Sequence, residues 1–298
     1  MKGLEFKQQT VDEWLMATPA IKGAVLYEDD SLANGERGLL ILFSEEESAI
    51  RCLQFPEEMG KLVQVRLSLD RLKAAPYRYE DRSLVHWLRK GIILTDPEEH
   101  LSELRRQLDE CTGLLQEKLV LTEFCLFYRH YLRSKRELEN QCLLDSFENL
   151  LQAIHHWGRL AVVEQGHYPE RMIWDQVRVE NVGVFKLYEE LTSSSESLLK
   201  RIQLVLLASD FCVVSKTTAC CSHLLRLLES REEPWGLQEL ERELGGAEIA
   251  VELGMLLSQL EVKALIREVL IPFDDELAVM ERKFFRSLDK NRRQFVKP

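Results

Sequence analysis

The sequence lacks the features that mark disulfide-rich, zinc-binding and membrane-spanning chains. Its seven cysteines are odd in number and form no C-x-x-C pair, and Cys220 and Cys221 are adjacent, which suits neither a disulfide framework nor zinc-ligand spacing. A membrane helix needs about 20 predominantly apolar residues, whereas the most apolar run, 202–214, is interrupted by Ser209 and Asp210. We therefore expect free thiols, no structural metal and no membrane span.

The chain also has too little positive charge to coat a polyanion. Its 39 basic and 50 acidic residues leave a formal net charge of −11, which repels nucleic acid and anionic lipid at long range. The segment 1–15 carries acids and no continuous apolar stretch, unlike a signal peptide. We expect a cytoplasmic protein without membrane contact.

The tail at 282–298 reverses this charge balance. This segment contains seven basic residues and one acid, which gives a local charge of 7 − 1 = +6. Such a segment suits RNA, another polyanion or the acidic body of its own protein. Because the rest of the chain is acidic, self-association or simple solvation is favoured over nucleic-acid binding.

Residues 1–111 predict a small mixed sheet with helices. We expect strands at 21–27, 38–43, 62–69 and 92–94, and helices at 11–17, 83–90 and 96–111. Apolar and polar residues alternate in the strand at 62–69, which places Gln64, Arg66 and Ser68 on a solvent-facing side. Asp96 is the predicted N-cap of the last helix.

Residues 112–195 predict a helical module. A long helix at 114–139 and a core helix beginning at Phe147 are joined by a short link, so we expect them to pack antiparallel. The core helix ends near Gly166, with Pro169 preventing its continuation. A further short helix is expected at 181–191.

A dense group of polar side chains follows the core helix of this module. His155, His156 and Arg159 lie within one turn of each other, and Tyr168 follows in the next loop. One interpretation is a binding surface, in which Arg159 pairs a phosphate and a histidine relays a proton. The other is that the two histidines border a helix–helix seam and are satisfied by carbonyl groups. The residues alone leave both open.

Residues 196–298 show the element order of a winged helix. Helices at 196–216, 217–230, 238–244 and 247–261 precede two apolar-rich runs at 264–271 and 277–283 that suit a hairpin. A helix that reads DNA needs basic residues for phosphates and base edges. The helix at 247–261 has three glutamates and neither lysine nor arginine. We therefore expect a packing or protein-contact module and no DNA binding.

The chain resembles a bacterial family of nucleotidyltransferase-like proteins. The resemblance rests on the order of elements in residues 1–111 and on two segments, LVHWLRKGIILTDPEEHLSELRRQL (84–108) and HHWGRLAVVEQGHYPE (155–170). The resemblance implies an α+β nucleotidyltransferase-like domain at 1–111, an all-α substrate-binding-type module at 112–195 and a helix-turn-helix-type, winged-helix-like domain at 196–298. It also implies that the helical module contributes the acceptor side of a cleft. The expected ligand contacts are His155, His156, Arg159, Tyr168 and Arg66.

The same resemblance allows a test of the chemistry, because nucleotidyl transfer needs carboxylates that hold divalent ions against a triphosphate. The family pattern has a Gly-Ser after the first strand, an Asp-x-Asp at the second and another Asp on the third. This chain has Tyr27-Glu28 at the first place, Glu36 as one carboxylate at the second, and Gln64 and Arg66 at the third. Glu36 is thus the expected catalytic residue.

Nearby acids at Asp30 and 45–47 are either substitute ligands or solvated turns. We take Glu36 and Asp30 as the expected metal ligands for Mg²⁺ with a nucleoside triphosphate.

Three functions remain after these observations. The first is metal-dependent transfer of a nucleotide to an unidentified acceptor, and the second is an inactive relative that binds a nucleotide, a small molecule or a protein. The third, a winged-helix regulator of transcription, is disfavoured by the acidic helix at 247–261. The apolar faces of the helical module are compatible with a homo-oligomer.

Overall fold

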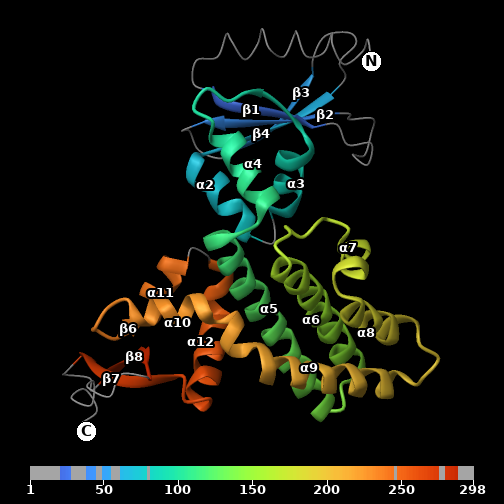
Figure 1. Ribbon diagram of the computed structural model, residues 1–298, viewed down its shortest axis with the longest axis vertical. Helices are drawn as coiled ribbons and strands as arrows, with labels where there is room; N and C mark the ends of the chain where they lie inside the picture. Colours follow the sequence, from blue (N-terminus) through green and yellow to red (C-terminus); the bar gives the residue numbers. More distant parts are fainter. Residues whose placement is uncertain are drawn as a thin grey trace. The chain divides into compact units, whose positions relative to one another are not determined.

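The computed structural model describes the chain at 21–27, 38–44, 49–54, 61–78, 81–244, 247–274 and 279–287. The chain divides into two compact units, Met1–Glu110 and Cys111–Pro298, which are described separately below and are drawn in Figure 1. The first contains a small mixed sheet with helices, and the second is mainly helical. The predicted α+β class is confirmed, whereas the predicted helix at 11–17 lies outside the described residues.

The first unit contains a five-stranded sheet with the strand order β3-β4-β2-β1-β5. Its strands are β1 (Ile21–Tyr27), β2 (Gly38–Ser44), β3 (Ala49–Gln54), β4 (Lys61–Leu67) and β5 (Ile92–Thr95). β2 and β4 are parallel and the other pairs are antiparallel. The mixed sheet was predicted, but β3 was not.

Four helical segments accompany this sheet. They are α2 (Leu69–Ala74), the 3₁₀ turn η2 (Ala75–Tyr77), α3 (Arg82–Lys90) and α4 (His100–Glu110). Helix α2 was not predicted, because the strand at 62–69 was expected to continue through its first residue. β4 instead ends at Leu67, and the Ser68 hydroxyl accepts a hydrogen bond from the Arg71 backbone N–H at 3.2 Å. Ser68 is therefore a helix cap rather than a strand residue.

The prediction that one side of β4 faces solvent is also wrong. Gln64 is buried, with 1% of its surface exposed. β4 lies between β2 and β3 in the sheet, so it is an interior strand, and alternation alone does not reveal whether a second face is covered. The Gln64 amide nitrogen has no hydrogen-bond partner among the described residues.

Helix α4 begins later than predicted. Asp96 does satisfy helix N–H groups, since its carboxylate accepts from Leu101 N at 3.1 Å and Ser102 N at 2.7 Å. The helix itself starts at His100, and Glu99 has a positive φ of 57°. The capping role was right, but Asp96 caps across a turn rather than as the residue next to the helix.

Gly91 joins α3 to β5 where the backbone passes very close to β1. A Cβ added there would lie 2.5 Å from Val25 Cγ1, 2.7 Å from Trp87 O and 2.8 Å from Leu26 O. Two of these three atoms are backbone, so the clash cannot be relieved by a side-chain rotation.

We expect Gly91→Ala to lower the free energy of unfolding by about 1 to 3 kcal/mol, measured by equilibrium urea denaturation. Gly254→Ala is the matched control, because nothing lies within 4 Å of an added Cβ there; alanine in that helix should be neutral or stabilising. Equal effects of the two substitutions would contradict the close approach at Gly91.

The second unit consists of eight helices and a small sheet within its described residues. The helices are α5 (Gly113–Glu139), α6 (Leu143–Glu164), α7 (Ile173–Glu180), α8 (Val182–Ser193), α9 (Leu198–Cys220), α10 (Ser222–Glu229), α11 (Leu237–Leu244) and α12 (Ala247–Val262). All but α7 were predicted, though α9 runs four residues past its expected end. One hydrophobic core extends from α5 to the C-terminal sheet, and the predicted division at residue 195 stays a prediction.

Helices α5 and α6 pack antiparallel, as predicted. Gln116, near the start of α5, donates to the Val163 carbonyl near the end of α6 at 2.9 Å. At the opposite end Ser134 donates to the Ser146 carbonyl at 2.8 Å. The two helices thus contact each other along most of their length (Figure 1).

The C-terminal end contains the predicted helices and hairpin. Strands β7 (Ile266–Asp274) and β8 (Val279–Arg286) pair antiparallel, and the two-residue β6 (Trp235–Gly236) adds to β8 in the order β6-β8-β7. Its assignment as a winged helix stays a prediction. In the described part of the chain no helix alone is long and apolar enough to cross a membrane; α9 and α10, bent by 41° at their junction, meet that criterion only as a pair.

Candidate functional site

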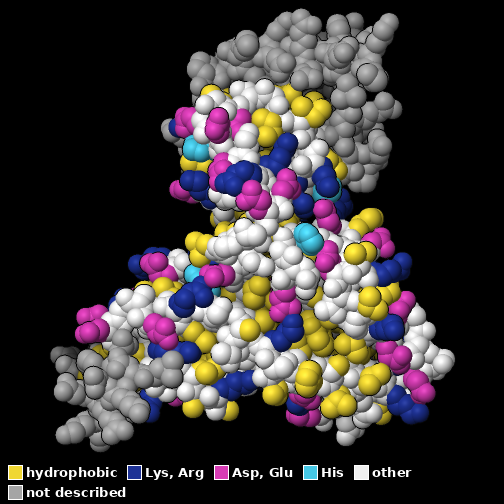
Figure 2. All heavy atoms as spheres, in the orientation of Figure 1, with side chains coloured by type: hydrophobic (Ala, Val, Ile, Leu, Met, Phe, Trp, Pro, Cys, Tyr) yellow, Lys and Arg dark blue, Asp and Glu magenta, His cyan; other side chains and the backbone are white. Residues whose placement is uncertain are grey.

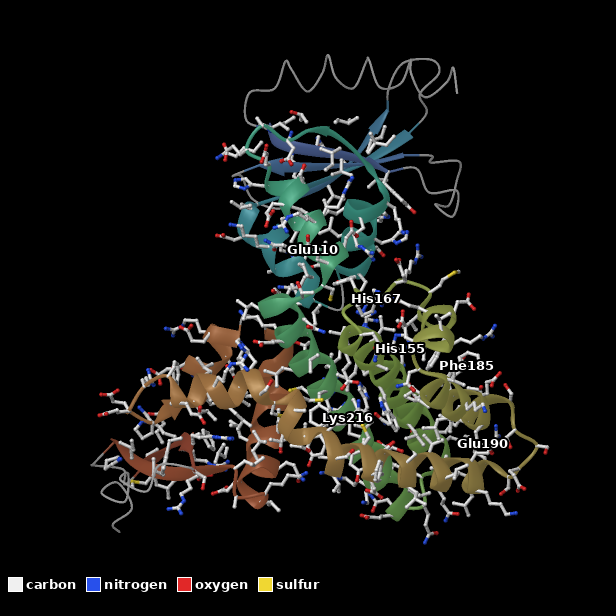
Figure 3. The ribbon with its side chains drawn as sticks, viewed as in Figure 1. Glu110, His155, His167, Phe185, Glu190 and Lys216 are labelled. Carbon is white, nitrogen blue, oxygen red and sulfur yellow. The ribbon has the colours of Figure 1, made fainter. Side chains whose placement is uncertain are left out.

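The residues predicted to bind ligand fall in different units. Arg66 lies on β4 in the first unit, whereas His155, His156 and Arg159 lie on α6 in the second, and Tyr168 follows α6. Figure 3 labels His155 on α6. The predicted metal ligands Glu36 and Asp30 lie outside the described residues.

Arginines gather where β4 passes into α2 in the first unit. Arg66 is the penultimate residue of β4, and Arg71 stands in the helix that Ser68 caps. β2 and β4 are parallel, so their carboxyl ends meet at one edge of the sheet. Ligands of sheets with parallel strands bind at such edges.

The Asp81 carboxylate pairs with two guanidinium groups. Its Oδ1 accepts from Arg71 Nη2 at 2.8 Å, and its Oδ2 lies 3.3 Å from Arg78 Nε. The Asp81 side chain is 10% exposed, against 27% for Arg71 and 35% for Arg78. Two cations around one largely buried carboxylate leave a local excess of positive charge. The sequence signal for this cluster, four arginines within 66–82, was not used above.

In the second unit His156 and Arg159 are buried in the α5–α6 seam. Arg159 Nε donates to Glu123 Oε1 at 2.6 Å, and His156 Nδ1 lies 2.8 Å from Glu123 Oε2. All three residues are 3% exposed. The seam interpretation therefore holds for His156, with a carboxylate in place of the expected carbonyl. Glu123 was missed, although an acid within the apolar stretch LTEFCLF is a recognisable signal.

The polar contacts of this seam continue to His130 on α5. Its ring stacks on His156 with a centroid distance of 5.7 Å, its Nδ1 lies 3.1 Å from Asn149 Oδ1, and its Nε2 lies 3.0 Å from Arg129 Nη2. Since a guanidinium only donates, Nε2 accepts and Nδ1 carries the proton. Burial, helped by the charges of Arg129 and His156 and opposed by the bond to Asn149, lowers the pKa of His130 to about 4.

This lowered pKa makes the protein's stability depend on pH. An unfolded histidine takes up a proton near pH 6.5, whereas His130 in the fold does so near its pKa of about 4. Between these values the unfolded chain binds more protons, so stability falls as the pH drops from about 6.5 towards 4.

We expect the unfolding free energy from urea titrations to fall less between pH 7 and pH 5 in His130→Gln than in the wild type. A pH dependence of His130→Gln equal to that of the wild type would contradict the assignment.

His155 and Tyr168 have different surroundings. The His155 ring meets Trp174 edge-on at 6.0 Å, and Trp174 stacks on Tyr188 at 3.7 Å. Tyr168 is 5% exposed, and its carbonyl accepts from Gln176. Of the four predicted contacts in this unit, His155 alone keeps a partly exposed side chain.

A hollow of about 470 Å³ opens between α6, α8 and α9. Its lining is mostly apolar, with Lys216 at its border, which Figure 3 labels. The lining residues are Trp157, Asn181, Gly183, Val184, Leu187, Leu204, Leu207, Ala208, Phe211 and Lys216. Lys216 forms an ion pair with Glu164, so the border of the hollow carries no net charge.

Within the described ranges, no group of three or more histidines, cysteines or acids is arranged to hold a metal ion. Six cysteines carry reduced thiols: Cys111, Cys125, Cys142, Cys212, Cys220 and Cys221. All of these but Cys142 are buried. Burial raises the pKa of Cys212 and Cys220 to about 12, so these thiols stay protonated and unreactive.

Comparisons with known proteins match both units. Residues 117–216 match the model of the YgxA-like substrate binding domain. The chain is 32% identical over 186 residues to an uncharacterized protein, YgxA, of Bacillus subtilis (strain 168). That match covers 62% of this chain and 63% of the relative, less than two thirds of its length.

The crystal structure of a nucleotidyltransferase-like protein from Exiguobacterium sibiricum 255-15 superposes with a TM-score of 0.79 and 25% identity, covering 95% of this chain and 99% of that one. The expected resemblance to nucleotidyltransferase-like proteins is therefore confirmed for the fold, and that to a substrate-binding-type module for residues 117–216. The helix-turn-helix-type assignment of the C-terminal end stays a prediction.

Proposed function

We propose that the first unit binds a nucleoside triphosphate at the carboxyl edge of β2 and β4. The observation that carries this proposal is the arginine cluster around Asp81, where Arg71 and Arg78 approach one carboxylate from two sides. Guanidinium groups pair phosphate oxygens in a bidentate manner. Both side chains stay partly exposed, so a ligand can reach them.

The fold supports the same proposal. The structure that resembles this chain over 95% of its length is described as nucleotidyltransferase-like. Phosphoryl and nucleotidyl transfer depends mainly on positioning and on neutralising the triphosphate. In our proposal Arg66 and Arg71 supply positive charge at this edge. Glu36 precedes β2 (Gly38–Ser44) in the chain, so Mg²⁺ held by Glu36 and Asp30 is a separate proposal, which Glu36→Ala tests below.

Calorimetric titration of the full chain with ATP, CTP, GTP and UTP, each with and without Mg²⁺, tests the proposal. We expect binding of at least one nucleotide and roughly tenfold weaker binding in Arg78→Gln, the loss of one charged contact. Arg106→Gln is the control, because Arg106 is exposed on α4 and pairs with Glu103 and Glu110. No binding by the wild type, or equal weakening by both variants, would contradict the proposal.

Glu36→Ala separates transfer from binding. Magnesium-dependent binding that is lost in this variant supports metal-dependent nucleotide transfer to an acceptor. Nucleotide binding that is independent of Mg²⁺ and unchanged by Glu36→Ala supports a catalytically inactive binding module.

We also infer that the helical unit provides the acceptor side. Its support is the match of residues 117–216 to a model described as a substrate binding domain. Of the predicted contacts in this unit, His155 alone has a partly exposed side chain, whereas His156 and Arg159 are buried in the seam between α5 and α6. A thermal-shift screen of small molecules should find a compound that raises the melting temperature of the wild type. The rise should be smaller in His155→Ala and unchanged in His167→Ala. Compounds whose effect is the same in His155→Ala would place the acceptor elsewhere.

A further inference from the structure

The outer face of α9 is apolar and exposed. Leu204, Leu207, Phe211 and Val214 recur at intervals of three, four and three residues, which places them on one side of the helix. Their exposed fractions lie between 47% and 75%. Large apolar groups that gather on a surface usually mark an interaction site, and Figure 2 shows hydrophobic side chains gathered on the visible face of this unit.

This face carries few charged side chains, and those on or beside it are already engaged. The other exposed positions between 203 and 219 are Gln203, Ser215, Thr218 and Ala219. The two charged residues of that stretch are paired, since Asp210 lies 2.9 Å from Lys135 and Lys216 pairs with Glu164. Lys263, which follows α12, donates to the Val213 and Val214 carbonyls.

The apolar face adjoins the hollow described above. Leu204, Leu207 and Phe211 form one wall of that hollow and also protrude from it, while Trp157 and Leu187 line it from α6 and α8. A ridge therefore lies beside a groove on the same surface. If the ridge of one copy enters the groove of a second copy related by a two-fold rotation, the reciprocal contact forms as well.

We propose that a second copy of this chain covers this face, giving an isologous dimer through α9 and the hollow. In such a dimer each patch meets the same patch of the partner, so like charges would face each other if the patch were charged. A mainly apolar patch, in which Asp210 and Lys216 are already paired within each copy, limits that repulsion. The net charge of −11 on each copy opposes approach at long range, so salt should strengthen the dimer by screening it.

The test is sedimentation velocity and light scattering of the full chain from about 1 to 100 μM. We expect a concentration-dependent dimer that is favoured by raising NaCl from 50 to about 500 mM. Phe211→Asp should weaken the dimer at least about 30-fold, the effect of a central interface residue. Val179→Asp is the control, because Val179 is 80% exposed on α7 and lies outside the patch; it should dimerise like the wild type.

Circular dichroism shows whether each variant is folded, and Leu207→Asp replaces Phe211→Asp if the latter unfolds. A wild type that stays monomeric at 100 μM would overturn the proposal, and so would dimers that persist in folded variants of both Phe211 and Leu207. A monomer that binds a neutral apolar dye in the hollow would assign it to a small molecule, and a monomer that floats with lipid vesicles would assign the face to a membrane. Either outcome rejects the dimer.

Discussion

Glu123→Ala should lower the free energy of unfolding by about 3 to 5 kcal/mol, one of the two largest effects expected for this protein. Glu123 is 3% exposed and binds both Arg159 and His156. Removing its carboxylate leaves a guanidinium buried without its counterion, and the desolvation of that charge is no longer offset. Equilibrium urea denaturation followed by circular dichroism gives the free energy.

Two comparisons isolate the cause of this loss. Glu196→Ala removes a carboxylate from an exposed pair with Lys200 in the same unit and should cost at most about 1 kcal/mol. The double variant Glu123→Leu with Arg159→Leu leaves no unpaired charge, so its loss should be smaller than that of Glu123→Ala alone. If Glu123→Ala cost no more than Glu196→Ala, the seam charges would be solvated and the buried cluster would not exist as described.

Leu150→Ala should lower the free energy of unfolding by about 2 to 5 kcal/mol. Leu150 is fully buried on α6, in the hydrophobic core that α5 and α6 share. The substitution removes apolar contacts and leaves a cavity, because packed helices relax only partly around a missing side chain.

Leu144→Ala provides the matched control for this prediction. It is the same substitution on the same helix, at a side chain that is 73% exposed, and it should change stability by no more than about 0.5 kcal/mol. Urea denaturation of the two variants side by side gives the difference. Similar effects at both positions would mean that α6 does not present Leu150 to the core.

The loops of the first unit explain why its site was hard to predict. Arg66 lies on β4, Arg71 on α2, Arg78 after η2 and Arg82 at the start of α3, and no period in the sequence links them. Arg71 and Arg78 meet only because β4 ends before Ser68 and the chain turns back to place Asp81 beside both. A pattern search for the carboxylates of nucleotide transfer looks for other residue types and passes over them.

The helical unit was predictable to a greater extent, because its helices carry strong local signals. Apolar residues at helical spacing, the Gly166 and Pro169 stop signals and the short link between α5 and α6 determine helix positions and their antiparallel packing without tertiary information. Helix α7 was missed because it is only eight residues long and lies in a segment rich in polar and aromatic groups. Periodicity is weakest over such short elements.

The sequence by itself therefore determined the α+β class, the central helical pair and the order of elements at the C-terminal end. Only the tertiary structure decided that His156 and Arg159 point into the seam, that Gln64 is buried and that the outer face of α9 is left uncovered within the described chain. The physical reason is that hydrogen-bonding and periodicity rules act between neighbours a few residues apart. Burial, in contrast, depends on which face a distant element covers, as Glu123 on α5 shows for His156 on α6.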